Sequence, residues 1–222
     1  MSEVISRAQA SAEWVAEQLR DMIVKGDLAP GARIVERKIS ADMNVSRTPV
    51  REALKLLRAD GLIEISMHRG AQVTRYTETE AQDLFDLIAV IEGLAAERLA
   101  ERITPRMLKE LEALHGQMID QYTSHDPSAY FDTNTEIHDM IVRQAGNQIL
   151  VESHRRVVVR ARRGRFMAIL DANRWKQAVD EHEAVMSAFR NRDAEAAGAI
   201  WRTHLRHTGD TVAAVLRQTS RG

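Results

Sequence analysis

Three histidines and one asparagine have the residue types and spacing of metal ligands. His138, His182 and His204 each lie in an apolar stripe of a segment with helical periodicity, and Asn134 stands one helical turn before His138. Imidazoles that converge inside a helical bundle form a good first shell for a borderline divalent ion such as zinc or nickel, and an amide oxygen can add to it. The sequence therefore predicts a divalent metal site made by these four residues. The alternative, in which each histidine is a core residue with one satisfied hydrogen bond, stays open.

A second set of polar residues suits the recognition of duplex DNA. Arg47 and Arg51 lie four residues apart on one face of a predicted helix, near its start. An arginine at that place can pair with guanine O6 and N7 in the major groove or contact a phosphate. The other candidates for contacts to DNA, at its phosphates, an adjacent base or the neighbouring minor groove, are Arg37, Ser46, Thr48, His68, Arg69 and Gly70. The alternative is a solvated charged surface with no partner.

The elements around these arginines have the pattern of a winged helix-turn-helix. A first short helix is predicted by apolar residues at three- to four-residue intervals, namely Ile34, Val35, Ile39 and Met43. A second helix begins at Ser46 or Thr48 and ends at Gly61. Alternating apolar residues over 63–65, a turn and a return strand over 71–74 predict a small β-wing.

The chain divides into two predicted domains, residues 1–77 and 78–222. The first holds the winged helix-turn-helix, with an amphipathic helix over about 10–24 upstream, and so has three helices and the wing. The second has helical periodicity throughout and predicts an all-α bundle of about six helices, over 80–102, 105–122, 127–145, 148–170, 174–191 and 193–218. The fold class is therefore mainly α.

The composition excludes several classes of protein. The absence of cysteine excludes a disulfide framework and a thiolate zinc site. No apolar run reaches the ~20 residues of a membrane span and the N-terminus lacks signal-peptide features, so we expect a cytoplasmic protein without membrane contact. Residues 1–77 carry 12 Lys+Arg against 10 Asp+Glu, whereas the remainder carries 19 against 22.

One winged helix reads few base pairs, so a homodimer on palindromic double-stranded DNA is expected.

The N-terminal third resembles the GntR family of bacterial transcription regulators. The resemblance rests on the run VSRTPVREAL over 45–54, on Leu57 and Gly61-Leu62, and on the wing sequence RGAQV over 69–73. It implies that Arg37, Arg47 and Arg51 contact the operator. By the same resemblance Thr48 and the Arg69-Gly70 wing assist them.

The second domain resembles the FadR C-terminal domain (FCD), the ligand-sensing module of one GntR subfamily. Metal-binding members have Asp-x-x-x-His on one helix and single histidines on two later helices, which correspond here to Asn134, His138, His182 and His204. Asn134 in place of aspartate implies weaker metal binding. Ile88 stands where many members have an arginine suited to a carboxylate effector, so Arg160 is our candidate for a pocket-facing arginine, and Asn147 is a second candidate effector-binding residue.

These resemblances imply a repressor whose operator affinity is modulated by a small metabolite, an organic acid, bound in the helical domain. Two alternatives remain: an effector-independent DNA-binding protein with structural histidines, and a metal-dependent enzyme domain fused to a DNA-binding domain. The sequence does not favour an enzyme, because Met186 stands where the His-Glu-x-x-His motif of a zinc hydrolase beginning at His182 would need its second histidine.

Overall fold

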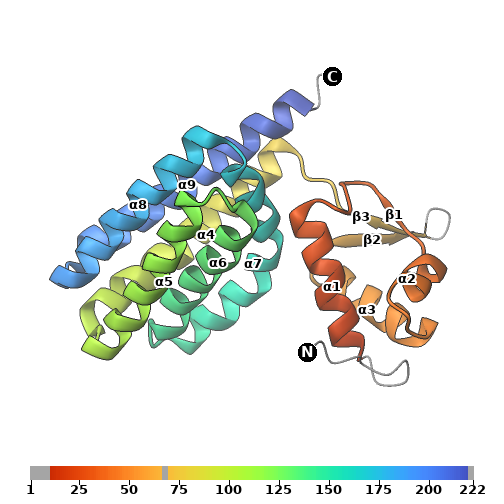
Figure 1. Ribbon diagram of the computed structural model, residues 1–222, viewed down its shortest axis with the longest axis horizontal. Coiled ribbons are helices and arrows are strands. Elements are labelled where there is room, and N and C mark those ends of the chain that lie inside the picture. The colour runs from red at the N-terminus through yellow and green to blue at the C-terminus, as the bar shows by residue number, and fades with distance from the viewer. Residues whose placement is uncertain (1–10, 67–69, 220–222) are drawn as a thin grey trace. The chain divides into compact units, whose positions relative to one another are not determined.

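The computed structural model describes residues 11–66 and 70–219, which form two compact units that divide between Arg75 and Tyr76 (Figure 1). Among these residues the fold is mainly helical, with one small antiparallel sheet in the first unit. No helix among them combines the length and the apolar character needed to cross a bilayer. The mainly α fold class predicted from the sequence is confirmed.

The first unit is a three-helix domain with a three-stranded sheet. Its elements are α1 (Ala12–Lys25), β1 (Arg33–Ile34), α2 (Glu36–Asp42), α3 (Arg47–Ala59), β2 (Ile63–Ser66) and β3 (Gly70–Val73). Helix α1 begins because the Ser11 side chain accepts a hydrogen bond from the Trp14 backbone N–H, and it ends at Gly26, whose φ of 94° suits a residue without Cβ. Helix α3 packs on α1 through its buried face, formed by Val50, Ala53, Leu54 and Leu57.

The start of α2 differs from the prediction. Ile34, which we expected in the helical stripe, lies in β1 and pairs with Ala71, so β3 is the central strand in the order β1-β3-β2. Val35 is the N-cap residue of α2, and its side chain is exposed. The prediction was wrong here because two apolar residues at helical spacing from Ile39 also fit a two-residue strand, a length too short for any alternation to appear.

The second unit is a bundle of six helices. They are α4 (Glu78–Arg102), α5 (Pro105–Thr123), α6 (Pro127–Gln144), α7 (Gln148–Ile169), α8 (Ala172–Asn191) and α9 (Ala194–Thr219). Side-chain caps set their starts: Thr77 and Glu80 form a capping box at α4, and Asp171 accepts from the Arg174 backbone N–H at α8. Capping explains why α4 and α8 each begin two residues before the predicted position.

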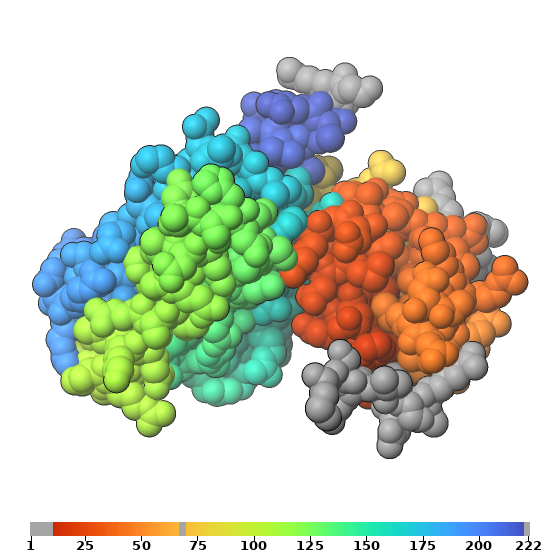
Figure 2. Space-filling model, in the orientation of Figure 1, coloured from red at the N-terminus to blue at the C-terminus, as the bar shows by residue number. Residues whose placement is uncertain are grey.

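Helix α4 is the central helix of this bundle, because it packs along α9 and also contacts α6, α7 and α8. The close approach of α4 and α9 needs a small residue at Gly209, where a Cβ atom would lie only 2.7 Å from the Cβ of Phe85. In the space-filling view, α5 and α8 lie side by side and cover one face of the unit (Figure 2). The bundle therefore has an interior lined by α4, α6, α8 and α9, in which polar side chains are shielded from water.

Candidate metal centre and DNA-binding surface

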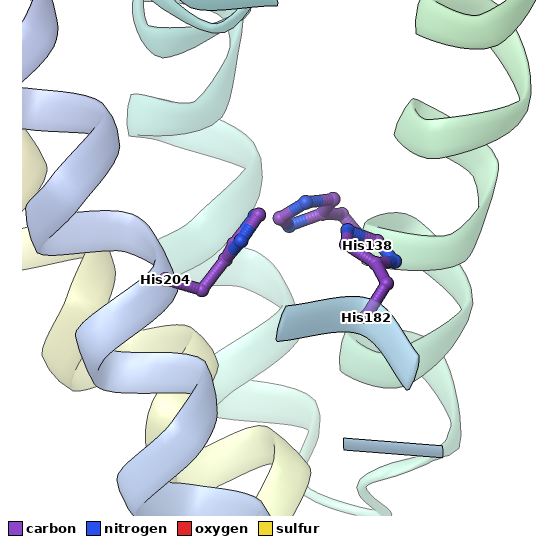
Figure 3. A group of neighbouring side chains, drawn as sticks. All are labelled: His138, His182 and His204. Atoms are coloured by element: carbon purple, nitrogen blue, oxygen red, sulfur yellow. The ribbon is translucent and has the colours of Figure 1, made fainter. Parts of the chain in front are cut away.

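The three predicted histidine ligands lie together in this interior. His138 on α6, His182 on α8 and His204 on α9 each offer a ring nitrogen, and these three atoms all lie within 4.8 Å of one another. Figure 3 shows the rings facing one another from three helices. Their residues are 0%, 1% and 3% exposed. The indole of Trp201 adjoins all three rings, with ring centroids 4.5–4.8 Å apart, and is stacked on His204.

Glu92 on α4 is an ionised carboxylate beneath His138. It is fully buried and its oxygens lie 2.5 Å from His138 Nδ1, 2.9 Å from His154 Nε2 and 3.2 Å from Trp201 Nε1. Burial raises the pKa of Glu92, but the electrostatic interaction with His138, the hydrogen bonds from His138 and His154 and the charge of Arg165 outweigh burial and hold that pKa well below its ordinary value. A carboxylate only accepts, so Nδ1 of His138 carries the proton and Nε2 keeps its lone pair.

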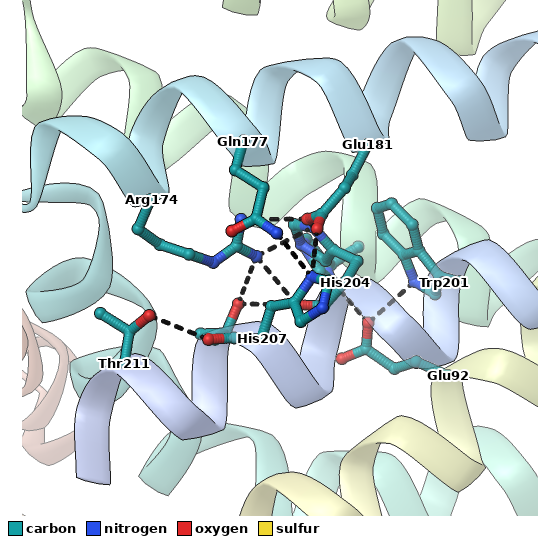
Figure 4. Close-up of polar contacts among 10 residues, drawn as sticks. Glu92, Arg174, Gln177, Glu181, Trp201, His204, His207 and Thr211 are labelled. Atoms are coloured by element: carbon teal, nitrogen blue, oxygen red, sulfur yellow. Dashed lines mark hydrogen bonds and ion pairs between the residues drawn. The ribbon is translucent and has the colours of Figure 1, made fainter. Parts of the chain in front are cut away.

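Glu181 on α8 is the corresponding carboxylate beside Nδ1 of His204 (Figure 4). Its Oε2 lies 2.7 Å from His204 Nδ1, and Arg174 forms an ion pair with it at 3.0 Å. Burial raises the pKa of Glu181, but hydrogen bonds from His204 and His207 and the charge of Arg174 lower it to about 2. Arg174 Nη2 also lies 3.3 Å from His204 Nδ1, but that group donates instead to the His204 carbonyl and to Thr208 Oγ1, both at 2.8 Å. His204 therefore donates from Nδ1 to Glu181.

His182 differs from the other two histidines, because neither of its ring nitrogens has a hydrogen-bond partner among the described residues. The Nε2 of His138 and the Oδ1 of buried Asn134 also lack partners. Burial lowers the pKa of His138 to about 3 and that of His182 well below its ordinary value, so these rings are neutral. Neutral imidazoles with free lone pairs beside an orphaned amide oxygen fit the donor set of a borderline divalent ion.

The structure does not bring Arg160 and Asn147 to this cluster. Arg160 lies over the Tyr76 ring at 5.4 Å, and Asn147 is an exposed N-cap residue that accepts from the Leu150 backbone N–H. Their role in effector binding stays a prediction. The buried guanidinium of α7 is instead Arg165, which is 2% exposed; within the part of the chain that the structure describes, none of its three nitrogens has a hydrogen-bond partner. Burial lowers the pKa of Arg165.

The first unit gathers four of the eight residues predicted to contact DNA in one groove. Arg37, Arg47, Arg51 and Gly70 line one groove, together with Arg33 and Lys55, two basic residues that the sequence reasoning did not select. Ser46 and Thr48 are exposed at the start of α3, but the Ser46 side chain makes no capping hydrogen bond and stays free to contact a phosphate. His68 and Arg69 lie outside the described residues.

The two leading arginines share one acidic neighbour. Arg51 Nε lies 2.9 Å from Glu36 Oε2, and Arg47 Nη2 lies 3.5 Å from the same oxygen. Both arginine side chains remain more than half exposed, so this pairing is weak and easily exchanged. Glu36 also lines the groove, so both guanidinium groups lie beside it there.

Comparison with known proteins supports both halves of this description. Residues 11–73 match the bacterial regulatory proteins of the gntR family, and residues 83–207 match the FCD domain. The HTH-type transcriptional repressor RspR of Escherichia coli K12 is 28% identical over 203 residues, covering 91% of this chain and 89% of the relative. The gluconate operon transcriptional repressor of Bacillus licheniformis is 26% identical over 200 residues, covering 86% and 80%.

Solved structures have the same architecture. A putative GntR transcriptional regulator from Rhodococcus sp. RHA1 superposes with a TM-score of 0.76 at 25% identity, covering 91% of this chain and 97% of the other. The fold is also that of McbR/YncC from E. coli, with a TM-score of 0.78 at 21% identity, covering 94% and 98%. The chain therefore belongs to the GntR family of bacterial regulatory proteins and carries an FCD domain as its C-terminal unit.

Proposed function

We propose that this protein is a sequence-specific transcription repressor whose operator affinity is modulated by a small organic acid bound in the FCD domain. The observation that carries the proposal is the buried cluster of three imidazoles in one unit of a chain whose other unit presents a basic groove. Within the described residues, both ring nitrogens of His182, Nε2 of His138 and Oδ1 of Asn134 are buried without a hydrogen-bond partner, which is costly to a fold unless something binds them. The names of the relatives, which are transcriptional repressors, point in the same direction.

The ligand-binding half of the proposal assigns a divalent ion to His138, His182 and His204, with the Asn134 oxygen as a weaker donor. Zinc and nickel both accept imidazole nitrogen, and a bound ion would supply a Lewis-acidic position for an effector carboxylate. A carboxylate effector that coordinates such an ion directly would need no arginine at position 88.

A homodimer is the form in which this repressor would bind a palindromic operator. Helix α4 carries three large apolar side chains exposed on one stripe at helical spacing, Leu87, Val90 and Leu94, which are 49%, 57% and 37% exposed. An exposed apolar stripe of this kind is typical of a protein interface. We assign it to contact with α4 of a second copy, since a two-fold axis would bring like stripes together.

Replacing Val90 with glutamate is expected to weaken dimerisation roughly 100-fold, because each interface would bury two unpaired charges at a cost on the order of 3 kcal/mol. Sedimentation velocity across a dilution series measures the shift. Ile149→Glu is the matched control, because Ile149 is 71% exposed on α7 and lies outside the stripe. Equal dissociation constants for the two variants would remove α4 from the interface.

The whole proposal is tested by operator release. An operator fragment is first selected from random duplex DNA with the full chain, and its affinity is then measured by fluorescence anisotropy with a panel of small carboxylic acids. We expect at least one acid to change operator affinity about 5- to 150-fold in zinc-loaded protein and to have no effect after chelation. If the chain selects a DNA sequence but no acid alters binding, it is an effector-independent regulator. If no sequence is enriched, the DNA-binding assignment itself fails.

A further inference from the structure

Two carboxylates outside the ligand set stand behind two of the three histidines. Glu92 reaches His138 from α4, and Glu181 reaches His204 from α8, each through the Nδ1 atom of the ring. Neither glutamate belongs to the histidine cluster itself. Because the same contact between a carboxylate and Nδ1 occurs at two histidines, from two different helices, we expect both glutamates to have the same role.

We propose that Glu92 and Glu181 are positioning residues of the metal centre, which fix His138 and His204 as Nε2 ligands. Their two negative charges also compensate for the charge that is missing because Asn134 stands in place of aspartate. The inference rests on the proposed metal site. A carboxylate that accepts a hydrogen bond from Nδ1–H leaves the lone pair on Nε2, orients the ring and raises its basicity as a ligand. The carboxylates of Glu92 and Glu181 would thus lie behind the histidine rings, in place of one aspartate carboxylate that binds the ion directly.

The surroundings of each glutamate support this task. Glu92 is held by His154 and Trp201 as well as by His138, so the carboxylate has a fixed orientation. Glu181 is held by Arg174 at 3.0 Å and by His207 at 2.6 Å. A carboxylate with several donors on its oxygens cannot rotate away, and the ring that it anchors is therefore held before an ion arrives.

His182 has no such anchor. With neither nitrogen bonded, its ring is free of hydrogen-bond restraint and can present either atom to the ion. The three ligands therefore divide into two fixed positions and one adjustable one. The fixed pair defines where the ion sits, and His182 completes the shell.

The test compares Glu181→Gln and Glu92→Gln with Asp180→Asn in the full chain. Asp180 is the matched control, because it removes one negative charge from the neighbouring position of α8 while its partner is Lys176 and no imidazole. Zinc affinity is measured by competition with a chromophoric chelator, and ligand geometry is read from the visible spectrum of the cobalt-loaded protein. Thermal melting without metal checks that each variant folds.

We expect Glu181→Gln to weaken zinc binding about 10- to 100-fold and to change the cobalt spectrum, whereas Asp180→Asn stays within about twofold of the wild type. Glu92→Gln should have the same effect, but its amide N–H₂ would face a donor, so if that variant fails to fold the Glu181 variant decides. Wild-type affinity and spectra in the folded glutamine variants, or an equal loss in Asp180→Asn, would overturn the proposal. Wild-type protein that binds no zinc would instead overturn the metal site on which it rests.

Discussion

Replacing His182 with alanine is expected to abolish zinc binding and the part of the thermal stability that depends on it. Metal that binds only the folded state adds about 2.7 kcal/mol of stability at a free concentration 100 times its dissociation constant. For a domain of this size, that corresponds to a drop of several degrees in the melting temperature on chelation. The wild type should therefore show this drop and His182→Ala should not. Elemental analysis and calorimetry with and without chelator provide the measurement.

Two further variants separate ligand loss from damage to the core. His182→Phe keeps a flat aromatic ring, somewhat larger than imidazole, and removes nitrogens that have no partner among the described residues, so it should fold yet bind no zinc. His125→Asn removes an exposed histidine whose ring contacts the nearby Thr123 carbonyl, and asparagine tolerates its φ of 56°. This control should bind zinc like the wild type. Full zinc occupancy in His182→Phe would contradict the site, and a wild type indifferent to chelation would make the histidines core residues.

Replacing Arg47 or Arg51 with alanine is expected to weaken specific operator binding by about 1–3 kcal/mol each, since a bidentate contact to guanine contributes that much discrimination. Both side chains line the groove of the first unit, and their ion pairs with Glu36 are weak, so contacts to the operator can replace them at little cost. Fluorescence anisotropy at fixed salt, with the operator and a mismatched duplex, gives the loss and the change in specificity.

Arg58→Ala is the matched control for these arginines. Arg58 is exposed in the last turn of the same helix α3 but does not line the groove. Removing its charge should affect the operator and the mismatched duplex alike, and by less than the loss of Arg51. Equal losses for Arg51→Ala and Arg58→Ala would mean that charge alone, rather than base contact, determines binding.

Most of the fold could be predicted from the sequence because its signals are local. The helices of the bundle begin at caps within a few residues of their own sequence, as Thr77 and Asp171 show, and end where apolar periodicity stops. The strand Arg33–Ile34 could not be predicted, because it exists only through pairing with Gln72 and Ala71 almost forty residues later. A two-residue strand has no pattern of its own.

Only part of the candidate site could be predicted, because some of its contacts join residues that are distant in the sequence. Each histidine shows its inward direction by its position in an apolar stripe, so the cluster could be expected. Glu92 also lies among apolar residues of α4, but its partners are 46, 62 and 109 residues away and nothing local indicates them. The arginine-rich run of α7 did not reveal which member is buried: we selected Arg160, whereas the deeply buried guanidinium is Arg165.

The placement of Trp201 has an optical consequence. Its indole touches all three histidine rings, so any ion held by them would sit beside a natural fluorophore. A paramagnetic ion such as nickel would quench the emission of that indole, whereas zinc, with its filled d shell, would leave it bright. With a metal bound as proposed, the emission of Trp201 would therefore distinguish nickel from zinc without any label.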